Sequence, residues 1–255
     1  MQFVMETSLW MNIVGEFLGT FLLVFLGNGS CFSVNHRKMF ANQPGKWIIV
    51  VFGWAAAAFI ALFVSLSLGA PGNLNPAVSI YFSFKDPIFL IYIVPQLMGA
   101  IIAQTFLYIM NYYFIKVELN SIDGNNEATR ASSCTNPVYN NNEALLGNLL
   151  YEFMGTSVLM LVVFIFNNFV ILNQGNVIDI TIVSISIISI GISVGSATGF
   201  AINPARDLGP RIVYQILLFT KYGKGLVNAN WQYSWVPVVG SILAGVLFGL
   251  ISLAL

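Results

Sequence analysis

The sequence predicts an all-α membrane protein that is built from two inverted repeats. Of the 255 residues, 57% are hydrophobic and only 8% are charged, whereas about 25% of an average soluble domain is charged. Several motifs also occur twice, in the same order, in the two halves of the chain. A highly apolar chain with an internal repeat of this kind indicates a polytopic helical protein.

A helix needs about 20 apolar residues to cross the hydrocarbon core of a bilayer. Six stretches have roughly this length, and we expect them to span the membrane: 12–34, 47–68, 88–114, 147–169, 178–195 and 231–255. We do not expect the first to be a cleavable signal peptide, because it has no basic n-region and its apolar run is too long. The connecting loops are too short to hold a soluble catalytic fold, so we expect one domain over residues 1–255.

Three motifs support a duplication. They are Glu-Phe-x-Gly-Thr at Glu16 and Glu152, Asn-Pro-Ala at Asn75 and Asn203, and Gly-x-Ile-x-Ala at Gly99 and Gly240. The repeats, about 12–114 and 147–255, each contain three predicted spans. Because three is odd, the second copy enters the membrane in the opposite orientation, which gives an inverted repeat with its pseudo-two-fold axis in the membrane plane.

The two Asn-Pro-Ala motifs predict two re-entrant half-helices. Each motif precedes an apolar stretch that is too short to cross the membrane. Proline is favoured at the first helical position, and the asparagine before it is a good N-cap. Inverted symmetry would bring the two N-termini together near the midplane. The motif residues are Asn75, Pro76, Ala77, Asn203, Pro204 and Ala205.

The surroundings of the motifs predict a pore. Each half-helix N-terminus carries about half a positive charge, which repels cations, and the asparagine amides could donate to a passing oxygen. The extended segments before the motifs have carbonyl groups without helical partners, which could form a ladder of acceptors. Its expected members are Pro71, Gly72, Asn73, Leu74, Gly199, Ala201 and Ile202. Lining donors, acceptors and electrostatic barriers of this kind set the selectivity of channels.

Three charged residues are expected to support the pore. Ionisable groups inside spans are functional candidates, and we expect Glu16 and Glu152 to accept hydrogen bonds from the backbone N–H groups of the irregular loops. Arg206 follows the second motif directly, where the first motif has Val78. This asymmetry predicts that Arg206 supplies hydrogen-bond donors and rejects cations at one constriction.

These motifs resemble the major intrinsic protein family, the aquaporins and glycerol facilitators, over nearly the whole chain. The resemblance implies a right-handed bundle of six transmembrane helices plus two half-helices. It also implies a homotetramer with one pore per subunit in the cell membrane, with cytoplasmic termini. The charge distribution favours the opposite orientation. With cytoplasmic termini, most Lys and Arg residues would lie outside the cell, against the positive-inside rule.

By resemblance, the selectivity filter maps to Phe52, Gly191, Phe200 and Arg206. Water-selective members have a histidine where this chain has Gly191, so a wider, amphipathic opening suited to a polyol is expected. Phe52 stands where bacterial glycerol facilitators tend to have tryptophan, which predicts somewhat broader passage of solutes and water. Asn73 likewise replaces the family's usual histidine.

Asp207 and Arg211 also resemble the residues that glycerol facilitators have at these positions. The two lie four residues apart on one helix face and are expected to pair. The resemblance therefore implies an aquaglyceroporin, a passive channel for glycerol, other small uncharged solutes and water that excludes ions and protons.

The sequence also bears on other functions. A mainly water-selective channel is the alternative within the same class, and a closed pore with a structural role stays open. An ion channel would need acidic rings, and a coupled transporter would need a titratable pair at the midplane. An enzyme is not expected, because His36 is the only histidine and Cys31 and Cys134 lack metal-ligand spacing. We expect no cofactor, metal or nucleic acid; the expected partners are glycerol, water, small neutral solutes and the lipid bilayer.

Overall fold

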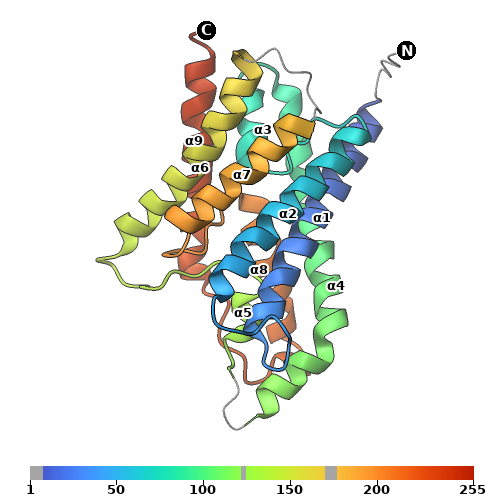
Figure 1. The fold of residues 1–255 in the computed structure, drawn as a ribbon, viewed down its shortest axis with the longest axis vertical. Helices are drawn as coiled ribbons and strands as arrows, with labels where there is room; N and C mark the ends of the chain where they lie inside the picture. Colours follow the sequence, from blue (N-terminus) through green and yellow to red (C-terminus); the bar gives the residue numbers. More distant parts are fainter. Residues whose placement is uncertain (1–7, 122–124, 170–176) are drawn as a thin grey trace.

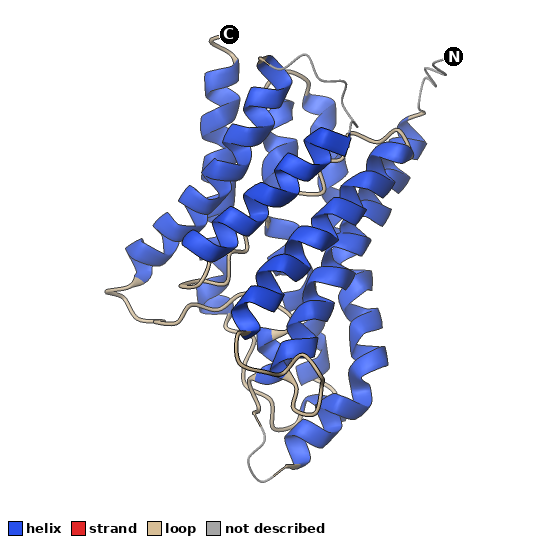
Figure 2. Ribbon diagram, in the orientation of Figure 1, coloured by secondary structure: helices blue, strands red, loops and turns tan. Residues whose placement is uncertain are grey.

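The computed structural model describes residues 8–121, 125–169 and 177–255, and its regular elements are helices (Figure 2). Five helical segments of this described part are long and apolar enough to cross a membrane: α1 (Leu9–Asn35), α2 (Lys46–Ser67), η1 and α4 (Pro87–Asn120), α6 (Leu145–Asn168) and α9 (Trp231–Ser252). The sixth predicted span is α7 (Val177–Ser193), an apolar helix of 17 residues. At 1.5 Å per residue it extends about 26 Å. The predicted fold class is confirmed.

The two Asn-Pro-Ala motifs begin two short helices, as predicted. Helix α3 (Pro76–Ser83) follows Asn75, whose Oδ1 accepts a hydrogen bond from Ala77 N at 2.9 Å. Helix α8 (Pro204–Leu218) follows Asn203, whose Oδ1 accepts from Ala205 N at 3.0 Å. In both, proline occupies the first turn, where its missing N–H costs no intrahelical bond. A further short helix, α5 (Ala128–Ala131), lies between α4 and α6.

The helices pack as two matched sets (Figure 1). Helix α1 packs against α2 and α4, and α6 packs against α7 and α9 in the same way. The half-helices cross between the sets, because α3 packs on α9 and α8 packs on α4. This exchange of half-helices is what an inverted repeat predicts, and it holds both motifs at the centre of the bundle.

The bundle has two ends, which are named here by what lies at each (Figure 1). Helix α1 begins and α9 ends at the terminal end. The segments 36–45 and 125–144 lie at the opposite end, the loop end. Between the ends, α4 exposes large apolar side chains that suit contact with lipid, among them Val94, Met98, Phe106, Ile109 and Met110.

Buried glycines bring the repeated spans into close contact. A Cβ on Gly99 of α4 would lie 2.5 Å from Phe17 O of α1, and a Cβ on Gly240 of α9 would lie 2.9 Å from Glu152 Cβ and 3.1 Å from Phe153 N of α6. Both glycines therefore pack against the helix that carries the Glu-Phe-x-Gly-Thr motif, each within its own repeat. The third repeated motif thus marks a close helix–helix contact in each half.

Replacing Gly99 by alanine should destabilise the protein by about 1–3 kcal/mol, because the added methyl group meets backbone atoms that cannot rotate away. Gly147→Ala is the matched control, since nothing lies within 4 Å of a Cβ at that helical position. Thermal unfolding in detergent would compare the two variants. A Gly99→Ala protein as stable as Gly147→Ala would contradict this account of the packing.

Candidate functional site

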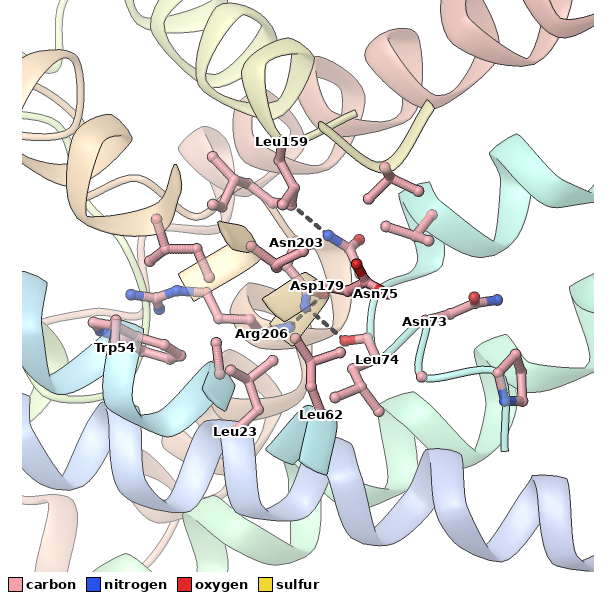
Figure 3. Close-up of a pocket in the computed structure, with 18 of the residues that line it drawn as sticks. Leu23, Trp54, Leu62, Asn73, Leu74, Asn75, Leu159, Asp179, Asn203 and Arg206 are labelled. Carbon is pink, nitrogen blue, oxygen red and sulfur yellow. Dashed lines mark hydrogen bonds between the residues drawn. The ribbon is translucent and has the colours of Figure 1, made fainter. Parts of the chain in front are cut away.

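A cavity of about 190 Å³ runs through the middle of the bundle, between the two repeats (Figure 3). Its lining includes both motif asparagines, the extended segments that precede them, and side chains of α2, α6 and α7. A second cavity, of about 240 Å³, opens at the loop end and is lined by residues such as Trp47, Thr135 and Asn136. Arg206 lines both cavities, so it stands at the boundary between them.

The motif asparagines connect the two repeats directly. Asn75 Nδ2 donates to Ile202 O at 2.8 Å, and Asn203 Nδ2 donates to Leu74 O at 2.8 Å. Each asparagine thus caps its own half-helix through Oδ1 and holds the opposite loop through Nδ2. A carboxamide nitrogen has two protons, so one proton of each group is left for a solute in the cavity.

The two buried glutamates hold the irregular loops, as predicted. Glu16 accepts from Asn73 N at 2.7 Å and from Leu74 N at 2.8 Å. Glu152 accepts from Ala201 N at 3.1 Å and from Ile202 N at 3.0 Å. These bonds stabilise an unusual backbone, because Leu74 and Ile202 have φ angles of 51° and 44°. Left-handed conformations of non-glycine residues persist only where their surroundings impose them.

The expected carbonyl ladder is only partly free. Leu74 and Ile202 each use one lone pair of the carbonyl oxygen to accept from the opposite asparagine. Within the described part of the chain, no donor reaches the carbonyl oxygens of the remaining expected members: Pro71, Gly72, Asn73, Gly199 and Ala201. Of these five, all but Gly199 line the central cavity with the motif asparagines, and Gly199 lines the second one.

The structure corrects one predicted filter residue. Phe52 is 53% exposed on the outer surface of α2 and lines neither cavity. Trp54 is 4% exposed, lines the central cavity, and has its ring centroid 4.1 Å from Arg206 Cζ, a cation–π contact. Side chains two positions apart on a helix point about 200° away from each other. A shift from Phe52 to Trp54 therefore exchanges the outer face of α2 for the pore face. The expectation of broader passage, which rested on Phe52, therefore loses its basis.

Gly191 and Phe200 lie beside this opening. A Cβ on Gly191 would lie 2.8 Å from Val51 Cγ2 and 3.3 Å from Phe200 Cζ. Phe200 lines the central cavity and packs edge-on against Trp47, whose Nε1 donates to Gly191 O at 3.0 Å. Gly191 itself lines neither cavity. It leaves the space in which the Phe200 ring packs.

The opening combines apolar walls with unpaired donors. Trp54 and Phe200 supply aromatic surface, while Trp54 Nε1 and Arg206 Nη1 are buried and have no partner within the described residues. Trp47 belongs to the same corner, although sequence reasoning missed it. Its position just inside the start of α2 gave no sign that its ring reaches across to Phe200 and Gly191.

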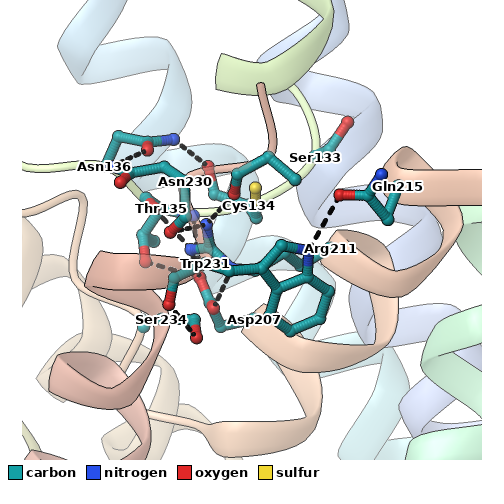
Figure 4. Close-up of polar contacts among 12 residues, drawn as sticks. Ser133, Cys134, Thr135, Asn136, Asp207, Arg211, Gln215, Asn230, Trp231 and Ser234 are labelled. Atoms are coloured by element: carbon teal, nitrogen blue, oxygen red, sulfur yellow. Dashed lines mark hydrogen bonds and ion pairs between the residues drawn. The ribbon is translucent and has the colours of Figure 1, made fainter. Parts of the chain in front are cut away.

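Asp207 and Arg211 form a buried ion pair, as predicted, with Nε and Oδ2 2.9 Å apart (Figure 4). The pair also anchors two connecting segments. Thr135 N donates to Asp207 Oδ1 at 2.8 Å, and Arg211 donates to Thr135 O at 2.7 Å and to Ala229 O at 2.5 Å. These long-range contacts, which spacing alone could not reveal, fix the chain over the loop end of the pore.

Cys31 and Cys134 are free, buried thiols that line the second cavity. Burial raises the pKa of the Cys134 thiol to about 11, so the group stays protonated at neutral pH. The thiolate is the reactive form of cysteine, and Cys134 is accordingly expected to be inert.

The sequence model of the family described as "Major intrinsic protein" matches residues 4–251. The chain belongs to the major intrinsic protein family. It is 37% identical to the "Probable glycerol uptake facilitator protein" of Mycoplasmoides gallisepticum over 94% of this chain and 96% of that relative. It is also 37% identical to the "Glycerol uptake facilitator protein" of Streptococcus pneumoniae, over 92% and 95% of the two chains.

A solved structure of the same fold supports this assignment. The aquaglyceroporin from Plasmodium falciparum superposes with a TM-score of 0.76 at 30% sequence identity, covering 95% of this chain and 94% of that one. As a member of the major intrinsic protein family, the chain is a membrane channel rather than an enzyme.

Proposed function

We propose that the chain conducts glycerol and other small uncharged solutes, together with water, down their concentration gradients. The observation that carries this proposal is the opening formed by Trp54, Phe200 and Arg206. Its two aromatic faces suit the C–H edge of a polyol, and its unpaired N–H groups suit the hydroxyl edge. The names of the bacterial relatives and of the Plasmodium channel agree with this substrate class.

The remaining site residues would then carry the solute and exclude charge. A hydroxyl oxygen that has passed Arg206 would accept from the second amide proton of Asn203 or Asn75, while its proton would be donated to the backbone carbonyls. Two half-helix N-termini and one arginine would oppose the entry of cations and protons.

Family membership also supports a proposal for the assembly and the placement in the membrane. We infer one channel domain over residues 1–255, assembled as a homotetramer in the cell membrane with one pore per subunit and cytoplasmic termini. In this orientation the terminal end faces the cytoplasm. The alternative, a mainly water-selective channel, is less well supported, because Gly191 leaves the opening without an imidazole.

Stopped-flow light scattering on proteoliposomes tests the proposal. The purified protein should raise glycerol, urea and water permeability above protein-free vesicles and leave proton leak, followed with a pH dye, unchanged. Raised water permeability without raised glycerol permeability would establish the water-selective alternative instead.

A further inference from the structure

The central cavity, which contains both motif asparagines, holds two buried oxygen atoms that have no hydrogen-bond partner: Asn73 Oδ1 and Asp179 Oδ1. Asn73 is 5% exposed, and its amide nitrogen is already used, because Nδ2 donates to Ser79 Oγ at 3.1 Å. Asp179 is half-buried in the first turn of α7. Buried acceptors are normally paired, so two unpaired ones in a single cavity are open to donors from a passing solute or from water.

The unpaired groups are ordered along the cavity. Donors stand at the filter, where Trp54 Nε1 and Arg206 Nη1 have no partner within the described residues. Asn73 belongs to the segment that leads from the end of α2 to Asn75, and Asp179 lies in the first turn of α7. Helix α2 ends and α7 begins at the terminal end (Figure 1), so both acceptors belong to segments that enter the bundle from that end. A solute crossing the bundle therefore meets donors first and acceptors second.

Helix electrostatics do not account for Asp179. An acid in the first turn stabilises a helix through its dipole, but that role is best filled by an exposed carboxylate and does not require an oxygen buried in a cavity wall. Lys85 does not pair with Asp179 either, because its Nζ donates to Asn168 Oδ1 at 3.1 Å. No described residue forms an ion pair with Asp179.

We propose that Asn73 and Asp179 form a second solute subsite, which selects for O–H donors on the terminal side of the paired asparagines. The proposal rests on the polyol conduction proposed above and adds a requirement to it. An ionised carboxylate only accepts hydrogen bonds, so a hydroxyl can pair with it and an ether oxygen cannot. The filter contributes donors, which can bind a hydroxyl oxygen or an ether oxygen. The second subsite contributes acceptors, so it distinguishes a hydroxyl from an ether.

Two isomeric solutes test this requirement. Propane-1,2-diol and 2-methoxyethanol have the same formula, but the first has two O–H donors and the second has one. Proteoliposomes containing the full chain would give the ratio of their permeabilities after subtraction of the protein-free rate. Asp179→Leu and Asp179→Ala should lower the diol-to-ether ratio about threefold, the effect expected from losing one hydrogen bond.

The controls separate a lost acceptor from other effects. Asp179→Asn keeps an acceptor oxygen and should retain the ratio, and so should Asp86→Asn, which removes an exposed N-cap carboxylate at the same end of the bundle. An unchanged ratio in both Asp179→Leu and Asp179→Ala, or an equal fall for the two solutes, would overturn the subsite while leaving polyol conduction intact. A wild-type protein that conducts neither solute would overturn both proposals.

Discussion

Gly191→His should lower glycerol permeability by about tenfold or more and water permeability much less. Even a Cβ at this position would lie 2.8 Å from Val51 Cγ2 and 3.3 Å from the Phe200 ring. An imidazole must therefore displace Phe200 or enter the opening, and either change narrows the passage between Trp54 and Arg206. A tenfold change requires only about 1.4 kcal/mol at the barrier, which is small compared with the cost of a steric overlap.

Stopped-flow measurements of both solutes on the same vesicles would check this expectation, and the ratio of the two permeabilities is independent of reconstitution yield. Gly147→Ala is again the control, because its added methyl group meets no atom within 4 Å. Equal losses of glycerol and water permeability would indicate a general failure of folding or closure, and the assignment of Gly191 to the filter region would then fail.

Asp207→Asn should destabilise the protein by about 3–5 kcal/mol, because removing one partner of a buried ion pair leaves the other charge uncompensated. Neither Asp207 nor Arg211 exposes its side chain. The same change weakens the contact of Asp207 with Thr135 and so loosens the segment over the loop end. Thermal unfolding in detergent would measure the loss of stability.

Glu127→Gln provides the comparison. Glu127 pairs with Arg130 at 3.3 Å, but its side chain is largely exposed. Exposed ion pairs contribute about 0–1 kcal/mol, so this substitution should change the unfolding temperature little. If Asp207→Asn were as mild as Glu127→Gln, the pair would not anchor the pore loops.

Most of the fold could be predicted because its signals are local. Apolar length located the spans, and the Asn-Pro pairs marked the two half-helices, since capping depends on adjacent residues. The duplicated motifs also placed Glu16 and Glu152 correctly beside the loops that they hold. The structure adds what each glutamate bonds to: the N–H group of a left-handed residue, Leu74 or Ile202, and the N–H group of the residue before it.

The filter shows where sequence reasoning stopped. The choice between Phe52 and Trp54 depends on the rotation of α2 about its axis, which is fixed by packing against α1 and α7 rather than by the residues themselves. Gly27 of α1 is part of that packing, because a Cβ there would lie 2.3 Å from Trp54 Cε3. The sequence could not reveal the unpaired oxygens of Asn73 and Asp179 either. Only the three-dimensional structure shows which buried polar atoms have no hydrogen-bond partner.

The most direct test of this account is the glycerol-to-water permeability ratio of Trp54→Phe and Trp54→Ala compared with Phe52→Ala, measured by stopped flow on proteoliposomes. The two positions lie two residues apart on one helix, but only Trp54 faces the cavity and Arg206. We expect the Trp54 variants to change the ratio severalfold, with the larger change in Trp54→Ala, and Phe52→Ala to match the wild type. A changed ratio in Phe52→Ala and a wild-type ratio in both Trp54 variants would contradict the account.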